Sequence, residues 1–309
     1  MRTIAGAGRA ASPVSALTDE RGGISAFLDG ASLELSSRDA SEIETCVGLL
    51  DPGTAVYISF PPGQTYHGIV ALAARIARAG FRPVPHVAAR RIASREALDD
   101  FLARVAGEAG ADGALVMGGD SDRTVGAFDS SLDLLETGLF QHHGIVRIGI
   151  AGYPEGHPRI APAALAAALA AKIAVARRAG MELSVVSQFC FDAEPILSWA
   201  TKVGMHGLPA RVGLAGPASL PKLLRFAAMC GVGNSLRALQ ARPGAITRLM
   251  VEAGPEEAVR GLARRAAPPI AGAHFFCFGG LVHTARWLRA VRDGRFELTE
   301  DGAFRVGSG

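Results

Sequence analysis

The stretch GALVMGGD at residues 113–120 is the clearest sign of the fold that the sequence predicts. It opens with an apolar run of strand length and ends in two glycines and an acid. A short apolar run without alternation is typical of a strand buried on both faces, as in a parallel sheet. Working outward along the chain, seven further runs of this kind are SLELS (from residue 32), AVYISF (55), PVPHVA (83), RIGIAGY (147), ELSVVSQFCF (182), ARVGLAG (210) and AHFFCFGG (273).

Segments with helical periodicity lie between these runs. Examples are residues 67–80, 94–110, 161–180 and 221–231, and each ends in a glycine suited to the position that follows a helix. Eight alternating strand and helix units predict the α/β class and a single closed (β/α)₈ barrel. The alternative is an open doubly wound sheet. Such a sheet would usually carry a glycine-rich turn after its first strand, and residues 33–36 lead into none.

The barrel is predicted to span residues 23–309. Residues 1–22 are rich in Ala, Gly, Ser and Arg with no acid before Asp19, which predicts a flexible N-terminal tail, although a transit peptide has a similar composition. Residues 233–269 carry two further helical patterns, so extra helices are predicted before the last strand. No repeat or low-complexity linker marks a second domain.

Composition narrows the class of protein. The chain has 309 residues, of which 49% are hydrophobic and 20% charged, enough apolar surface for a large core. A net charge of +3, spread over helices, argues against nucleic-acid binding, and no apolar run is long enough to cross a membrane. The four cysteines lack the spacing of a metal site, so no metal is expected, and their apolar surroundings favour a reducing, cytoplasmic location. The formation of a homo-oligomer is left open.

Polar residues near the carboxyl ends of the predicted strands are the candidate site, because active sites of (β/α)₈ barrels form there. Glu34 lies between Leu33 and Leu35, where burial without a partner would raise its pKa and suit it to general acid catalysis. The alternative is a structural Glu paired with an Arg or Lys in the barrel interior. The other candidates are Ser59, His86, Asp120, Tyr153, His157 and Gln188.

These other candidates also have structural interpretations. The Gly-Gly-Asp that ends in Asp120 lets a flat ligand approach the backbone, or is simply a turn. The loop YPEGHP (residues 153–158) has a tightly restricted shape, which suits either a ligand contact by His157 or a rigid surface turn. His86 suits a ligand contact or a hydrogen-bonded core position. The amide of Gln188 suits the edge of a heterocycle or a contact with the neighbouring strand.

Taken in order, these motifs resemble the methylenetetrahydrofolate reductase family over roughly residues 32–280. In that family strand one carries a catalytic Glu, strand three a Pro-His, strand four ends in Gly-Asp, and strand five leads into Tyr-Pro-Glu-x-His-Pro. Here these are Glu34, Pro85 with His86, Gly119 with Asp120, and YPEGHP. The family's Thr-Gln-x-Phe-Phe-Asp is similar to SQFCFD (187–192), and its helix after strand seven is similar to PKLLRFAAMCG (221–231).

The resemblance implies an FAD enzyme that takes hydride from NADH or NADPH and converts 5,10-methylenetetrahydrofolate to 5-methyltetrahydrofolate, so the substrate would be a folate. Glu34 would be the general acid that opens the imidazolidine ring, and Asp120 would stabilise the resulting cation beside flavin and pterin. Gln188, together with Glu34, would hold the substrate. The residues that would contact FAD are Ser59, His86, Gly119, Asp120, Phe128, Tyr153, His157 and Lys172.

Several positions depart from the family pattern. Residues 35–38 (LSSR) replace the family's Phe-Phe-Pro-Pro, and Gly118 replaces the Arg before Gly-Asp. The phosphate-binding Lys is out of register, with Lys172 about one helical turn earlier. Leu220 and Gly280 replace an aromatic that stacks on nicotinamide and an Arg. Because charge-assisted hydrogen bonds are the strong ones, the missing Arg and the shifted Lys predict weak FAD retention unless Arg123 or Lys172 substitutes. Leu220 cannot stack on nicotinamide, which predicts poor reduction by NAD(P)H.

Two other functions stay open at this point. One is a folate-dependent methyltransferase that binds the pterin through Asp120 and needs no flavin. The other is a catalytically idle subunit that binds folate or a partner. The physiological direction of the reaction depends on the electron donor and is not encoded in these motifs.

Overall fold

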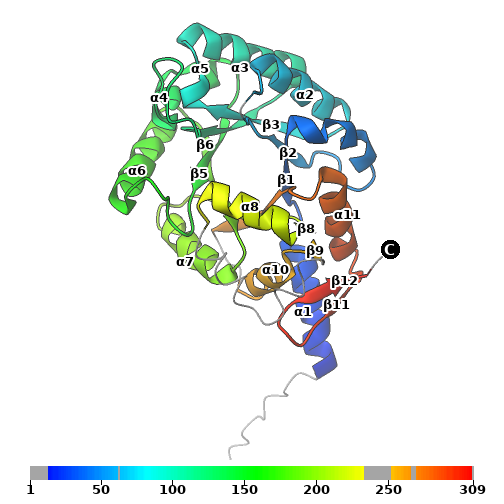
Figure 1. Ribbon diagram of the computed structural model, residues 1–309. Helices are drawn as coiled ribbons and strands as arrows, with labels where there is room; N and C mark the ends of the chain where they lie inside the picture. The colour runs from blue at the N-terminus through cyan, green and yellow to red at the C-terminus, as the bar shows by residue number, and fades with distance from the viewer. Residues whose placement is uncertain (1–12, 62, 233–251, 266–268, 308–309) are drawn as a thin grey trace, which may run out of the picture.

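Eight parallel strands close into a barrel, which confirms the predicted fold (Figure 1). The computed structural model describes residues 13–61, 63–232, 252–265 and 269–307. The strand order around the ring is β1-β10-β7-β6-β5-β4-β3-β2, so β10 closes the barrel against β1. All eight apolar runs form its strands, which are β1 (Ser32–Leu35), β2 (Ala55–Ile58), β3 (Arg82–Ala88), β4 (Gly113–Met117), β5 (Arg147–Gly152), β6 (Glu182–Cys190), β7 (Ala210–Ala215) and β10 (Ile270–Phe276).

Helices surround the barrel and cover its outward-facing apolar side chains (Figure 1). They form where apolar residues recur at helical spacing. In α3 (Arg95–Ala109), for example, the Ser94 side chain caps the first turn, and Gly110 ends the helix with a φ of +61°. The other helices of the ring are α2 (Tyr66–Arg78), α4 (Ser131–Glu136), α5 (Leu139–His142), α6 (Pro162–Arg178), α7 (Ala193–Gly204), α8 (Leu220–Cys230), α10 (Glu256–Ala263) and α11 (Leu281–Arg292).

Short elements complete the described chain. Three 3₁₀ helices, η1 (Ser37–Glu42), η2 (Glu44–Cys46) and η3 (Ala89–Arg91), follow β1 and β3. Two antiparallel pairs lie outside the barrel: β8 (Ala218–Ser219) with β9 (Glu252–Ala253), and β11 (Phe296–Leu298) with β12 (Phe304–Val306). None of the described helices has the length and apolar character needed to cross a membrane.

The N-terminal segment differs from the prediction. Residues 13–22, expected in a tail, belong to α1 (Pro13–Phe27), whereas residues 1–12 lie outside the described residues. Helix α1 packs against α10 and α11 and buries Ile24 and Leu28 completely. These contacts join residues more than 200 positions apart, so local composition does not reveal them. Of the two extra helices predicted for residues 233–269, α10 is present, and the other falls on residues outside the described part of the chain.

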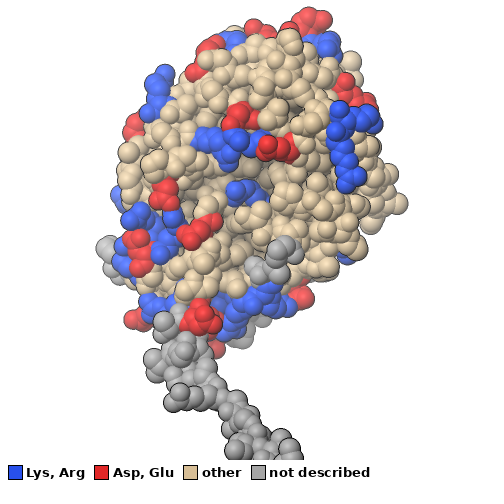
Figure 2. Space-filling view, turned by 180° about the vertical axis from the view of Figure 1, so that it is seen from behind, with Lys and Arg blue, Asp and Glu red and all other residues tan. Residues whose placement is uncertain are grey.

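The two ends of the barrel differ. Helix α8 follows β7 and lies across the opening at the carboxyl ends of the strands, the face turned to the viewer in Figure 1. The amino ends open onto the opposite face, where acidic and basic side chains lie near the middle (Figure 2). Catalytic residues of (β/α)₈ barrels lie at the carboxyl end, so the candidate active site is expected under α8.

A β-bulge between β6 and β7 shapes the barrel near Gln188. Val186 pairs with Arg211 and Phe189 with Gly213, so Ser187 and Gln188 lie opposite the single residue Val212, and β6 carries one extra residue. The Gly213 amide donates to the Ser187 hydroxyl at 2.7 Å. A Cβ on Gly213 would lie 2.3 Å from the Ser187 carbonyl oxygen, so only glycine fits beside the bulge.

We therefore expect Gly213→Ala to lower the free energy of unfolding by about 3 kcal/mol, at the upper end of overpacking costs because the clash is with backbone. Urea unfolding measures the change. Gly107→Ala is the matched control, because Gly107 lies inside α3 with no atom within 4 Å of the added Cβ. That substitution should stabilise by about 0.5–1 kcal/mol. Equal effects at the two positions would contradict the close approach at the bulge.

Candidate active site

Glu34 lies inside the carboxyl end of the barrel between two histidines. Its side chain is 15% exposed, and its Oε2 lies 3.3 Å from His86 Nε2 and 3.4 Å from His274 Nε2. β1 lies next to β10, which carries His274, while β2 separates it from β3, which carries His86. The three side chains therefore converge on the barrel interior from three strands. We call Glu34, His86 and His274 the Glu34 cluster.

A second hydrogen bond fixes His274. Its Nδ1 lies 2.9 Å from the Ser32 hydroxyl, and both His274 and Ser32 are fully buried. Both contacts of the ring are satisfied together when Ser32 donates to Nδ1 and the Nε2–H donates to Glu34. The ring of Tyr57 on β2 packs edge-on against His274, with centroids 4.5 Å apart. Ser32, His274 and Glu34 thus form a continuous chain of hydrogen-bonding groups.

The protonation state of Glu34 differs from the prediction. Burial acts to raise the pKa of the carboxyl, but the charge and contact of His86 and the hydrogen bond from His274 outweigh it and hold the pKa well below its ordinary value. The predicted raised pKa is wrong, because Glu34 is buried with partners rather than alone. The alternative of a paired carboxylate is closer, with histidines in place of Arg or Lys. Burial lowers the pKa of His274, which favours the neutral ring.

Asp120 lies on the loop after β4, at the same end of the barrel, with its side chain 69% exposed. Arg91 Nη2 donates to its Oδ1 at 3.0 Å. Arg91 is held in turn, because its guanidinium lies over the Phe60 ring and its carbonyl accepts the Tyr66 hydroxyl. Asp120 is therefore positioned by an arginine that the motifs did not single out.

Glu34 and Asp120 both act on the end of α8. Burial raises the pKa of the Cys230 thiol to about 11, and the charges of Glu34 and Asp120 add to that rise. Both carboxylates are therefore within electrostatic reach of one side chain. The predicted pair shares the same end of the barrel, although each carboxylate has its own partners.

Most of the residues expected to contact FAD lie on this rim. The Ser59 hydroxyl donates to the Leu35 carbonyl at 2.9 Å, and Phe128 packs against the core from the loop before α4. Gly119 has a φ of +96°, and a Cβ there would lie 3.3 Å from Ala88. A positive φ and the nearby Ala88 both favour glycine at this position.

The loop after β5 contributes two rings in edge-to-face contact. Tyr153 and His157 pack edge to face with centroids 4.8 Å apart, and His157 Nδ1 accepts the amide of Arg159 at 3.1 Å. Burial raises the pKa of Tyr153 and lowers that of His157. A neutral His157 beside Tyr153 suits contact with a flat ring.

Gln188 and Lys172 are placed differently. Gln188 lies in the β6 bulge, where its Oε1 accepts the amide of Phe189 at 3.0 Å. Lys172 lies on α6 ten residues after Pro162, about 15 Å along the helix from its first residue. Burial lowers the pKa of Lys172, and it pairs with no carboxylate among the described residues. Its position on the outer ring separates it from the other predicted contacts.

An aromatic cluster lies beneath α8, and the motifs did not predict it. Phe226 of α8 stacks on Phe278, which follows β10, with centroids 4.1 Å apart and planes at 14°. Phe189 and Phe276 pack against Phe278 from below. The far end of α8 reaches the YPEGHP loop, because a Cβ on Gly231 would lie 2.8 Å from Pro158. Helix α8 thus contacts the barrel through Phe226 and the loop after β5 through Gly231.

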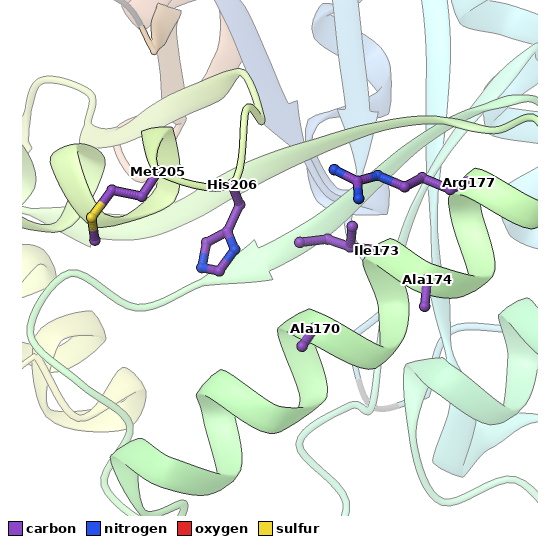
Figure 3. A pocket seen from close by; sticks show the side chains of 6 residues that line it. All are labelled: Ala170, Ile173, Ala174, Arg177, Met205 and His206. Atoms are coloured by element: carbon purple, nitrogen blue, oxygen red, sulfur yellow. The ribbon is translucent and has the colours of Figure 1, made fainter.

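Other cavities and polar groups lie away from Glu34. Figure 3 shows a cavity between α6 and the turn after α7, on the outer side of the barrel, with His206 and Arg177 among its lining residues. A second cavity lies at the amino ends of the strands. Ligand atoms of Asp99, His142 and His143 lie within 4.8 Å of one another between α3 and α5, where His143 Nε2 and Asp99 Oδ1 are 2.7 Å apart.

No model of a known protein family matches the sequence. Among solved structures, the chain is similar to a conserved protein of unknown function from Enterococcus faecalis, with 11% identity, a TM-score of 0.48, and coverage of 87% of this chain and 69% of that one. It is also similar to dihydropteroate synthase from Thermus thermophilus, with 15% identity, a TM-score of 0.44, and coverage of 85% and 93%. A second structure of that synthase, in complex with 6HMPPP, has 13% identity, a TM-score of 0.42, and coverage of 85% and 91%.

Proposed function

We propose that this chain binds a reduced folate at the carboxyl end of its barrel and interconverts 5,10-methylenetetrahydrofolate and 5-methyltetrahydrofolate. The observation that carries the proposal is the buried Glu34 cluster, because Glu34 matches the catalytic Glu of the family that the motifs resemble. The ordered motifs around it support the same assignment. FAD is the proposed cofactor, and NADH or NADPH the proposed source of electrons.

The Glu34 cluster would hold and transfer the proton that this reaction requires. Opening the imidazolidine ring requires a proton on a ring nitrogen and leaves a cation on the one-carbon unit. Because Glu34 contacts two histidines within 3.4 Å, the proton belongs to the cluster as a unit rather than to one carboxyl. Glu34 as a carboxylate would stabilise the cation, while the histidines would hold the proton. Gln188 would orient the pterin.

The residues at the rim fit the ring of a flavin better than its diphosphate. A bound flavin would carry hydride between the nicotinamide and the folate. Gly119, Tyr153 and His157 would line its ring. The arginines nearby are engaged, however, because Arg90 pairs with Asp129, Arg91 with Asp120 and Arg159 with Asp122. Arg123 pairs with no carboxylate among the described residues, and it is the side chain we assign to the diphosphate.

The engaged arginines also favour a second candidate. A pterin-binding methyltransferase without a flavin would hold the pterin through Asp120 and needs no cation for a diphosphate. The two functions differ in whether the protein binds FAD and in whether methyltetrahydrofolate reduces that flavin.

The test is purification with added FAD, followed by anaerobic mixing with methyltetrahydrofolate and then with NADH or NADPH. The proposed function predicts that methyltetrahydrofolate bleaches the visible absorbance of the bound flavin. The departures at Gly118 and Leu220 predict that FAD is lost on gel filtration and that NAD(P)H bleaches the flavin slowly. Consumption of methyltetrahydrofolate by a methyl acceptor, with no flavin bound at saturating FAD, would establish the methyltransferase instead. Failure to bind folate would overturn both.

A further inference from the structure

A cavity at the amino ends of the strands contains arginines that the proposed function does not use. Its volume is about 300 Å³, and its lining includes Gly30, which precedes β1, Arg82, which begins β3, and Arg211 of β7. Around the ring, β3 and β7 are separated by β2, β1 and β10. Arg82 and Arg211 therefore reach the cavity from two sides of the barrel.

The lining has an excess of positive charge. Three arginines, Arg82, Arg211 and Arg292, face the single carboxylate of Asp51. Arg292 donates to Asp51 at 2.5 Å and to Asp29 at 3.3 Å, so its charge is compensated. The excess therefore falls on Arg82 and Arg211, and basic side chains are visible near the middle of this face in Figure 2.

Arg82 and Arg211 lack carboxylate partners in the described part of the chain. Arg211 Nη1 donates to the Gly30 carbonyl at 2.9 Å. Arg82 Nε is buried and has no hydrogen-bond partner. A buried donor without an acceptor costs free energy, so an acceptor supplied from outside would be stabilising. Guanidinium groups match the oxygens of phosphate in pairs, which makes phosphate the anion that two arginines recognise best.

We propose that this cavity binds one phosphate group, free or as a small phosphate ester, between Arg82 and Arg211. The site is distinct from the Glu34 cluster, because it lies at the opposite end of the strands. The two ends are still in electrostatic contact through the barrel. Burial is the main cause of the lowered pKa of His274, and the charge of Arg211 contributes to it. A bound phosphate would offset that charge.

The test is isothermal titration calorimetry of the full chain with inorganic phosphate, in a chloride buffer of constant ionic strength. We expect one saturable site per chain. Arg211→Gln and Arg82→Gln should each weaken phosphate binding by about 10-fold or more, because each removes charge-assisted hydrogen bonds. Arg78→Gln, on the exposed side of α2, is the matched control and should bind phosphate as the original chain does.

Several outcomes would overturn the proposal. Binding that does not saturate, or that both cavity variants retain, would place phosphate elsewhere. Acetate that competes as strongly as phosphate would indicate a general anion effect. If Arg82→Gln does not fold, Arg211→Lys still decides the matter, because it keeps the charge but loses the paired donors. Phosphate binding to Arg211→Lys should then lie between that of the original chain and that of Arg211→Gln.

Discussion

Replacing Glu34 with Gln is expected to lower turnover of the proposed folate reaction by about 10²- to 10⁴-fold, the usual contribution of a positioned general acid or base. Gln keeps the shape of the side chain but cannot share a proton with His86 and His274. The measurement is kcat for oxidation of methyltetrahydrofolate with an artificial electron acceptor. Glu108→Gln on the exposed surface of α3 is the matched control and should leave kcat unchanged.

The same variant also tests the protonation state of the cluster. The pKa of Glu34 is held below its ordinary value of 4.5, at about 2, so its contribution to stability is complete above pH 4.5 and is lost as the pH falls toward 2. Glu34→Gln should remove that part of the acid sensitivity. An unchanged kcat in a folded variant would exclude Glu34 from the chemistry and favour a catalytically idle folate-binding subunit.

Replacing Glu20 with Gln is expected to lower the free energy of unfolding by about 3 kcal/mol, although Glu20 lies far from the carboxyl end of β1. Glu20 Oε1 accepts from Arg260 at 2.7 Å and from Arg264 at 2.6 Å. Arg260 is 6% exposed and also donates to the carbonyls of Thr299 and Ala303. Removing one partner of a buried ion pair costs about 3–5 kcal/mol, because the remaining charge stays buried.

Differential scanning calorimetry at two pH values measures this effect. The Tm should fall by roughly 5 °C at pH 7. Hydrogen bonds from Arg260 and Arg264 lower the pKa of Glu20 to about 2, so the stabilisation is present above pH 4.5 and disappears as the pH approaches 2. Glu44→Gln breaks the exposed pair with Arg75, which solvent screens, and should leave the Tm almost unchanged. A similar loss in both variants would contradict the role of burial.

The barrel could be predicted because each of its strands has a recognisable pattern in its own residues. Runs such as GALVMGG and ARVGLAG are apolar without alternation, and the count of eight favours closure. The position of Glu34 within the first of these runs then predicts which end of the barrel it lies at. These features are local in sequence, so no knowledge of distant partners was needed.

The partners of the candidate residues could not be predicted in the same way. Glu34 and His274 are 240 positions apart, and only the pairing of β1 with β10 brings them together. Without that contact, burial of Glu34 pointed to a raised pKa, the wrong direction. The available signal for His274 was a polar residue inside the apolar run AHFFCFGG, at a position that the alternation of side chains along a strand directs to the barrel interior. The signal for Arg91 as the partner of Asp120 was weaker, because an arginine after a strand is typical of the solvated surface.

If the proposed folate binds beneath α8, the stack of Phe226 on Phe278 would compete with it for the same space. Phe226 belongs to α8, which lies across the carboxyl end of the barrel, and in the proposed function a heterocycle would bind at that end. Because α8 belongs to the same chain, its effective concentration at that position does not fall on dilution. The apparent affinity for a folate is then the intrinsic affinity multiplied by the fraction of molecules in which the stack is open. A substitution that weakens the stack would tighten binding without touching the ligand.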